Sequence, residues 1–351
     1  MKPVLKKSGL FILIILGGLV LFPEANYAPH TPDESYLADS ANYVVPSMPD
    51  DWTWNSHLAK DGTKIRWGET SRSPDKPTVI FLPGYTSSLD IYGEHMAMLA
   101  ARGYNAVGLD LRGQGGSGRH RSEQPEKLFA ENFGVYSDDV VDFIKAQNFA
   151  PNHPVIILGS SFGGHVALRM AGDHDAPLSG LVLLAPAYVP NTAPFSIGAA
   201  KSLTAFAKLI GKDMRYAPGQ TDWKPFGTDL TAPNDCASNI KRLYMRDTLF
   251  VRRPEQRVGG VTNNYLRGLI TSGEMMLSPE YAAKIELPVT MVLAQEDVVI
   301  DGETSKSACT DLLPNCKAVV LPQTGHCLMF ESDTVINAIF DEIDTLAAQL
   351  P

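Results

Sequence analysis

The stretch GSSFGG, residues 159–164, lies between an apolar run, 154–158, and a helix-like run, 165–170. Glycine and serine often form an ordinary turn, but here Ser161 stands at the centre of a G-x-S-x-G pattern, whose glycines allow a sharp turn from strand into helix. Such a turn strains its central residue and pushes the hydroxyl out at the carboxyl end of the strand, where open α/β sheets bind ligands. The pattern predicts that Ser161 is a nucleophile and that Ser160 has a structural role.

Short apolar runs alternate with helical stretches along most of the chain. The runs are apolar throughout rather than at every second residue, which predicts parallel strands buried on both faces of a doubly wound α/β sheet. Before them, Asp61-Gly62 lies between two short strand-like runs and predicts a hairpin. The predicted strands are 78–82, 106–111, 155–158, 181–184, 289–293 and 318–321, and the predicted helices are 91–102, 136–147, 164–171, 304–313 and 335–350.

Residues 186–277 interrupt this alternation, because they contain no clear strand pattern. Apolar spacing predicts helices at 197–210 and 237–245. A structureless loop of this length is implausible within a compact domain. The interval is therefore predicted to be an inserted cap made of helices and loops.

A serine nucleophile needs a base, and the base needs a carboxylate that orients it. His326 follows the predicted strand 318–321, so it should lie at the carboxyl end of that strand. The loop after strand 289–293 offers Asp297, with Glu296 as the alternative. His165 is four residues past Ser161 on the same helix and is predicted to be a packing residue.

Acyl transfer also needs two N–H donors for the oxyanion. The residue after the nucleophile, Phe162, supplies one backbone N–H. The loop after strand 78–82 should supply the other, from Tyr85, because Gly84 allows the backbone to approach closely.

These residues resemble the serine α/β-hydrolase superfamily, in particular the monoacylglycerol lipase and lysophospholipase-like group, which shades into serine aminopeptidase-like sequences. The sequence DLRGQGGS, 110–117, resembles the D-x-R-G-x-G-x-S loop of that group, whose role is mainly structural, and Gly325-His326 followed by Glu331 resembles its G-H-x-x-x-x-E ending. A cap stretch that starts at residue 230 is a looser match. The family often has His-Gly in the oxyanion loop, whereas this chain has Pro83-Gly84. The resemblance covers about residues 55–350 and implies an α/β-hydrolase fold with an inserted helical cap.

The resemblance further implies a serine hydrolase that cleaves carboxylic esters through an acyl-enzyme and requires neither a metal nor an organic cofactor. Lipid-like acyl esters, such as a monoacylglycerol or a lysophospholipid, are the expected substrates. Two alternatives stay open: an amidase or aminopeptidase-type serine hydrolase, and a non-catalytic binding protein on the same scaffold. The cap aromatics are candidates for lining an acyl pocket, although most such residues simply belong to a core; they are Phe195, Phe206, Trp223 and Phe226.

The formal charge is −9 and no basic cluster occurs beyond the N-terminal end, which disfavours a nucleic-acid partner. Residues 1–28 are predicted to be a signal peptide or an N-terminal membrane anchor, because three lysines precede the apolar run 9–22. We therefore expect an exported protein, periplasmic or extracellular, or one anchored to the membrane by this segment. Residues 29–53 should form a linker or arm, and 54–351 the hydrolase domain.

Four cysteines allow three complete disulfide pairings. Cys309 and Cys316 are seven residues apart, across a predicted helix-to-strand turn, and form the favoured pair. The other two cysteines are Cys236 and Cys327. Four reduced, buried thiols are an equally compatible interpretation.

Overall fold

The computed structural model describes residues 27–32, 43–130, 132–225 and 236–350. The apolar run 9–22, predicted as an export signal or anchor, lies outside the described residues, and so does Phe226. Within the described ranges, no helix has both the length and the hydropathy that crossing a membrane requires.

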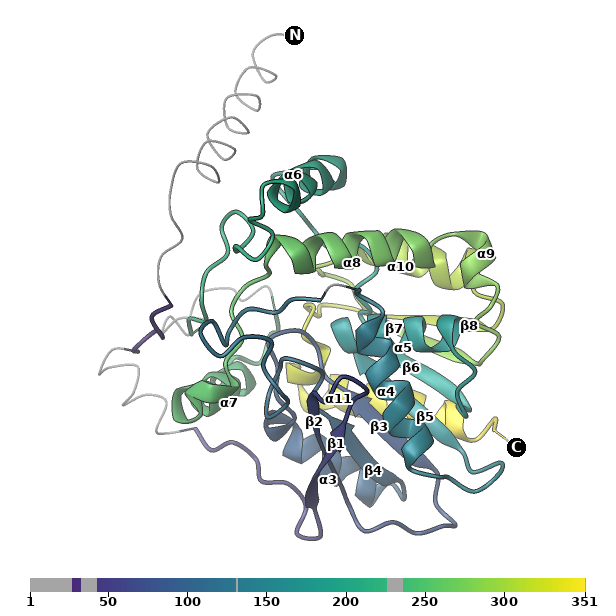
Figure 1. Ribbon diagram of the computed structural model, residues 1–351. Helices are drawn as coiled ribbons and strands as arrows, with labels where there is room; N and C mark the ends of the chain where they lie inside the picture. Colours follow the sequence, from purple (N-terminus) through teal and green to yellow (C-terminus); the bar gives the residue numbers. More distant parts are fainter. Residues whose placement is uncertain (1–26, 33–42, 131, 226–235, 351) are drawn as a thin grey trace.

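One sheet of eight strands, in the order β1-β2-β4-β3-β5-β6-β7-β8, forms the centre of the molecule (Figure 1). The strands are β1 Thr53–Leu58, β2 Lys64–Glu69, β3 Thr78–Leu82, β4 Asn105–Leu109, β5 Val155–Ser160, β6 Gly180–Leu184, β7 Val289–Ala294 and β8 Cys316–Leu321. Strands β3 to β8 pair in parallel, whereas β1 and β2 form the predicted antiparallel hairpin at one edge. The prediction of a mostly parallel, doubly wound sheet is confirmed.

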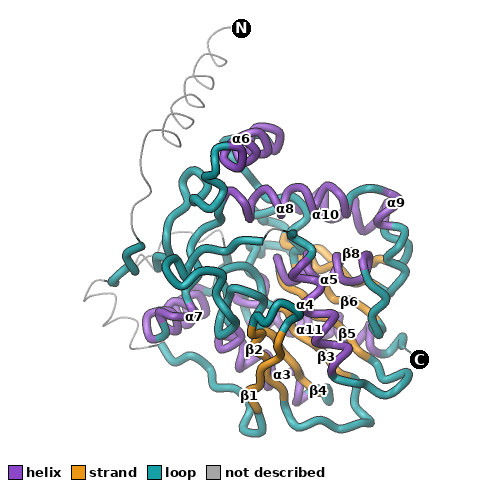
Figure 2. Tube along the Cα trace, in the orientation of Figure 1, coloured by secondary structure: helices purple, strands orange, loops and turns teal. Residues whose placement is uncertain are grey.

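Helices cover both faces of this sheet (Figure 2). The helices of the described residues are α3 Gly93–Ala101, α4 Val135–Ala146, α5 Phe162–Asp173, α6 Ile197–Leu209, α7 Ile240–Arg252, α8 Asn263–Met276, α9 Pro279–Ala282, α10 Gly302–Ser307 and α11 Asp333–Ala347. Three short 3₁₀ helices, η1 Leu89–Tyr92, η2 Pro254–Gln256 and η4 Leu328–Phe330, and a short π-helix, η3 Ala308–Leu312, complete the set. Helices α3 and α11 pack side by side, and Arg102 at the end of α3 donates to Asp341 at 2.7 Å and to Asp344 at 2.5 Å. Helices α4 and α5 cover the opposite face.

The central strands are apolar because both of their faces are covered. Every residue of β3, β4, β6 and β7 is buried, as expected for parallel strands between two helical layers.

One predicted helix, 304–313, needs correction. The helix begins at Gly302 and continues as a π-helix from Ala308 to Leu312.

The segment between β6 and β7, residues 185–288, is here called the insertion. It contains α6 at its predicted position, whereas α7 begins three residues after the start of the predicted helix 237–245 and ends seven residues beyond its end. It also contains α8, a helix that the sequence pattern did not reveal. Glycine lowers helix propensity, and α8 contains Gly268 and Gly273. A Cβ atom at Gly268 would lie 2.4 Å from the Phe133 ring, and one at Gly273 would lie 1.9 Å from the Tyr188 carbonyl oxygen. Close packing therefore requires glycine at both positions, and these glycines weaken the helical signal in the sequence. Helix α8 lies beside α6 and apart from α7 (Figure 1).

The described parts of the predicted arm, together with the two residues before it, contact the domain. Tyr27 donates to Glu126 at 3.0 Å, and Arg257 donates to the carbonyl oxygen of His30 at 2.8 Å. The ring of Tyr43 stacks on Tyr244 of α7, with 5.0 Å between the ring centroids.

All four cysteines are paired. Cys309 and Cys316 form the favoured disulfide, across the turn from the π-helix into β8. Cys236 and Cys327, 91 residues apart, form the second, so the interpretation with four reduced thiols is wrong. The second disulfide connects the insertion to the residue that follows His326.

Candidate active site

Ser161 is the single residue between the end of β5 and the start of α5. Its backbone has φ +50° and ψ −111°, a positive-φ conformation that a residue with a side chain rarely adopts. Three bonds hold it there: its N–H donates to the Leu184 carbonyl at 2.7 Å, and its own carbonyl accepts from His165 at 3.0 Å and from Ala187 at 3.1 Å. Strain of this kind is typical of functional sites.

The glycines around Ser161 are required by close contacts. A Cβ atom on Gly163 would lie 2.0 Å from the Leu82 carbonyl oxygen, and one on Gly159 would lie 2.8 Å from the Gly163 carbonyl oxygen. Helix α5 can therefore begin directly against β3 only with glycine at these positions.

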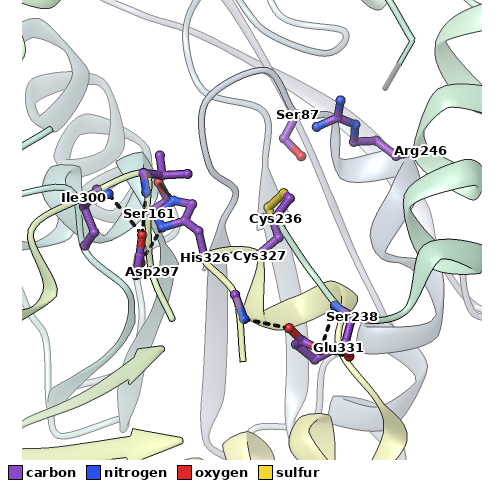
Figure 3. The surroundings of a disulfide bond; sticks show 12 residues. Ser87, Ser161, Cys236, Ser238, Arg246, Asp297, Ile300, His326, Cys327 and Glu331 are labelled. Atoms are coloured by element: carbon purple, nitrogen blue, oxygen red, sulfur yellow. Dashed lines mark hydrogen bonds and ion pairs between the residues drawn. A yellow bond between two sulfur atoms is a disulfide. The ribbon is translucent and has the colours of Figure 1, made fainter. Parts of the chain in front are cut away.

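The side chains of Ser161, His326 and Asp297 point toward one another (Figure 3). The Nε2 atom of His326 lies 2.8 Å from Ser161 Oγ, and its Nδ1 atom lies 2.7 Å from Asp297 Oδ2. The second carboxylate oxygen of Asp297 accepts from two backbone N–H groups, of Val299 at 2.9 Å and of Ile300 at 3.0 Å. With Nδ1–H donating to Asp297, Nε2 carries the lone pair that can accept the proton of Ser161.

The structure thus distinguishes the two carboxylates of the loop after β7. Asp297 has a side chain only 3 % exposed and meets the imidazole, which is 7 % exposed. Glu296 is exposed, and its backbone N–H donates to the Thr324 carbonyl oxygen at 3.0 Å.

The loop that carries His326 is held from both sides. Glu331 accepts from the Gly325 N–H at 2.9 Å and from the Ser238 N–H at 3.1 Å, so it ties this loop to the insertion. The Cys236–Cys327 disulfide does the same one residue after His326 (Figure 3). The G-H-x-x-x-x-E pattern gave a signal for Glu331, but no sequence pattern showed that both links reach the insertion.

The two residues predicted to donate backbone N–H groups to the oxyanion both belong to segments that adjoin Ser161. Phe162 is the first residue of α5, where an N–H has no acceptor within the helix. Tyr85 follows Gly84, whose added Cβ would lie 3.3 Å from Ser161 Cβ, so this loop runs directly against the serine. The Tyr85 hydroxyl donates to the Gly260 carbonyl at 3.1 Å, and its ring packs on Tyr265 with 4.5 Å between centroids.

Two other histidines of the sheet-covering helices are buried and engaged elsewhere. His165 contacts the Ala187 carbonyl at 2.7 Å and Ser272 Oγ at 2.8 Å, in agreement with its predicted packing role. Burial lowers the pKa of His165 to about 4 and that of His95 also to about 4.

The loop 110–117 has structural contacts. Asp110 is fully buried and accepts from the backbone N–H groups of Leu89 at 2.7 Å and of Gly116 at 2.9 Å. Arg112 bridges Asp139 and Asp61, each within 2.7 Å.

Two cavities meet at Ser161, and Tyr85 and Ser161 line both. The larger, of about 310 Å³, is here called the apolar cavity; it extends beneath the insertion and its lining includes Phe195, Leu203, Leu266, Leu269 and Val261. The smaller, of about 60 Å³, is here called the small cavity, and its lining includes Ser87, Tyr92, Arg246, His326 and Phe330.

Of the aromatic residues predicted to line an acyl pocket, one lines the apolar cavity. Phe195 lines the apolar cavity, as expected. Trp223 does not, because it is 3 % exposed and packs on Arg257 and Phe250. Phe206 is not among the lining residues either, and Phe226 lies outside the described residues.

The family described as Serine aminopeptidase, S33 matches residues 73–333. Lysophospholipase L2 of Escherichia coli K12 is 25% identical over 287 residues, covering 75% of this chain and 79% of that protein. Probable lysophospholipase L2 of Haemophilus influenzae is 22% identical, covering 69% and 74%. A solved structure of a soluble variant of monoglyceride lipase from Saccharomyces cerevisiae superimposes with a TM-score of 0.65 at 18% identity, covering 88% of this chain and 99% of that one. The fold is the α/β-hydrolase fold.

Proposed function

Because the chain belongs to the serine aminopeptidase S33 family, we propose that it hydrolyses carboxylic esters of lipid-like acyl groups through an acyl-enzyme on Ser161. The observation that carries the proposal is the continuous line of hydrogen bonds from Ser161 through His326 to Asp297. Ser161, at one end of this line, also lines the apolar cavity. The names of the relatives, lysophospholipase and monoglyceride lipase, agree with such a substrate.

In the proposed reaction, Ser161 Oγ attacks the carbonyl carbon while His326 Nε2 takes its proton. The N–H groups of Tyr85 and Phe162 stabilise the oxyanion. The bond from the carbonyl carbon to the alcohol oxygen then breaks, and His326 gives its proton to that oxygen. Water repeats the sequence on the acyl-enzyme, releasing the fatty acid and restoring Ser161. Asp297 orients the imidazole and stabilises the imidazolium, without taking the proton itself.

The two cavities give each half of the ester a separate place. His326 must reach the leaving oxygen, and it lines only the small cavity, so the alcohol leaves on that side. The acyl chain is then assigned to the apolar cavity, where burial of methylene groups contributes about 0.8 kcal/mol each.

A panel of p-nitrophenyl esters of increasing acyl length, run beside aminoacyl anilides, tests the reaction class. We expect ester turnover, labelling by a fluorophosphonate, and loss of both in Ser161→Ala. Ser160→Ala is the matched control, with a hydroxyl removed one residue earlier, and should lose less than about tenfold in kcat. Faster turnover of anilides would favour the amidase alternative, and an unlabelled wild type would favour a binding protein.

We also propose that the chain is exported or membrane-anchored. The lysine-flanked apolar run 9–22 supports this, and so do two disulfides, which persist in oxidising compartments. Mass spectrometry of the N-terminus in fractionated cells tests it, and a chain confined to the cytosol would contradict it.

A further inference from the structure

The small cavity contains a charge that hydrolysis of a neutral ester does not need. Arg246 comes from α7 of the insertion and is only 9 % exposed. Among the described residues that line this cavity, it alone has a permanent positive charge. Its guanidinium points toward Ser87 (Figure 3). Nothing in the acyl-transfer chemistry at Ser161 requires a cation at this position.

Arg246 lies on the side of the site assigned to the leaving alcohol, not on the side assigned to the acyl chain. Arg246 and His326 line the small cavity together, and neither lines the apolar cavity. Since the alcohol oxygen must lie near His326 Nε2 when it leaves, the rest of the alcohol enters the space that Arg246 borders. Arg246 therefore lies where it can contact groups attached to that alcohol.

The chemistry of the small cavity suits an oxyanion. A guanidinium has five N–H donors in a planar fork that matches a phosphate, so it can bind a ligand while it keeps its protein contacts. Within the described residues, Arg246 Nη2 forms an ion pair with Asp247 at 3.5 Å, a contact that leaves other N–H groups of the fork able to reach a ligand. Ser87, whose hydroxyl lies 2.9 Å from the Tyr92 hydroxyl, adds a neutral polar group to the same wall.

Building on the proposed ester hydrolysis, we propose that the small cavity binds a phosphate carried by the leaving alcohol and that Arg246 determines this specificity. The preferred substrate is then an acyl ester of a phosphorylated polyol, such as a 1-acylglycerol 3-phosphate, over the neutral monoacylglycerol. A cavity of about 60 Å³ favours a compact phosphate monoester over a phosphodiester with a bulky head group.

The test compares kcat/KM for 1-octanoylglycerol 3-phosphate and 1-octanoylglycerol, which share their acyl chain. We expect the wild type to prefer the phosphate ester by about tenfold or more, as for a charge-assisted contact. Arg246→Gln should reduce the ratio to within about twofold of unity, and Arg246→Lys should keep part of it. Arg252→Gln, an exposed arginine on the same helix, is the matched control and should keep the full ratio.

A second measurement needs no variant. Glycerol 3-phosphate should inhibit hydrolysis of p-nitrophenyl octanoate by the wild type at a concentration at least about tenfold lower than glycerol does. A wild type that prefers the neutral ester, or that the two alcohols inhibit equally, overturns the phosphate assignment while ester hydrolysis stands. A wild type that neither cleaves p-nitrophenyl octanoate nor reacts with a fluorophosphonate overturns both proposals.

Discussion

His326 lies 2.8 Å from Ser161, while the next residue, Cys327, is bonded to Cys236 of the insertion. The base of the proposed reaction is therefore fixed from two directions. One is the loop after β8, and the other is a disulfide to the insertion, which also supplies much of the wall of the apolar cavity. The Cys236–Cys327 disulfide therefore links the loop that carries His326 covalently to the insertion.

Replacing Asp297 by Asn should lower kcat by about 10⁴-fold with little change in fold, because the amide favours the wrong imidazole tautomer. Steady-state hydrolysis of p-nitrophenyl butyrate measures the effect. Glu296→Gln removes the neighbouring, exposed carboxylate and should leave kcat within about twofold. Equal losses in both variants would contradict the assignment of Asp297.

Removing the Cys236–Cys327 disulfide by paired Cys→Ser substitutions should lower both stability and kcat. Its loop spans 91 residues, for which the chain-entropy relation gives about 4 to 5 kcal/mol, and its loss frees the residue after His326. Denaturant unfolding and ester turnover at a temperature where both proteins are folded measure the two effects.

The Cys309–Cys316 disulfide is the internal control for that experiment. It closes only seven residues, for which the same relation gives about 2 to 3 kcal/mol, and it lies away from His326. The pair Cys309→Ser/Cys316→Ser should lose some stability and keep its kcat. An unchanged kcat in the Cys236/Cys327 pair would show that the disulfide does not position the base.

Leu203→Trp should shorten the preferred acyl chain. Leu203 of α6 lines the apolar cavity, so a larger side chain there takes space from the distal methylene groups. The ratio of kcat/KM for dodecanoyl to butanoyl esters should fall about tenfold. Leu209→Trp on the same helix, where the leucine is 82 % exposed, should leave the ratio unchanged. A ratio that falls equally in both would argue against the acyl assignment of this cavity.

Stability should fall as the pH is lowered from 7 toward 4. Burial lowers the pKa of His95 and of His165 to about 4, below the ordinary value near 6.5. Below pH 6.5 the unfolded chain binds protons that the folded chain does not, so unfolding is favoured, by up to about 3 kcal/mol for each group at pH 4.

Urea unfolding at pH 7, 6 and 5 measures this dependence. His165→Gln lacks one of the two titrating groups and should show a shallower fall, even though its stability at pH 7 is lower. A slope equal to that of the wild type would show that His165 does not titrate on unfolding.

The sequence alone determined the strand-helix order, the elbow at Ser161 and the roles expected of His326 and Asp297. These follow from local signals: apolar runs for buried parallel strands, glycines where a backbone approaches closely, and polar residues directly after strands. Because the predicted strands are parallel, residues that directly follow them lie together at the carboxyl ends of the strands.

Only the tertiary structure decided how the insertion meets the site. Helix α8 is hidden in the sequence because its glycines are selected by contacts with Phe133 and Tyr188, which are distant in the chain. The same holds for the Cys236–Cys327 disulfide and for Arg246 at the wall of the small cavity. Contacts between residues that are distant in the chain produce no periodic pattern in the sequence. The disulfide next to the base and the arginine near the leaving group can therefore be recognised only in the folded chain.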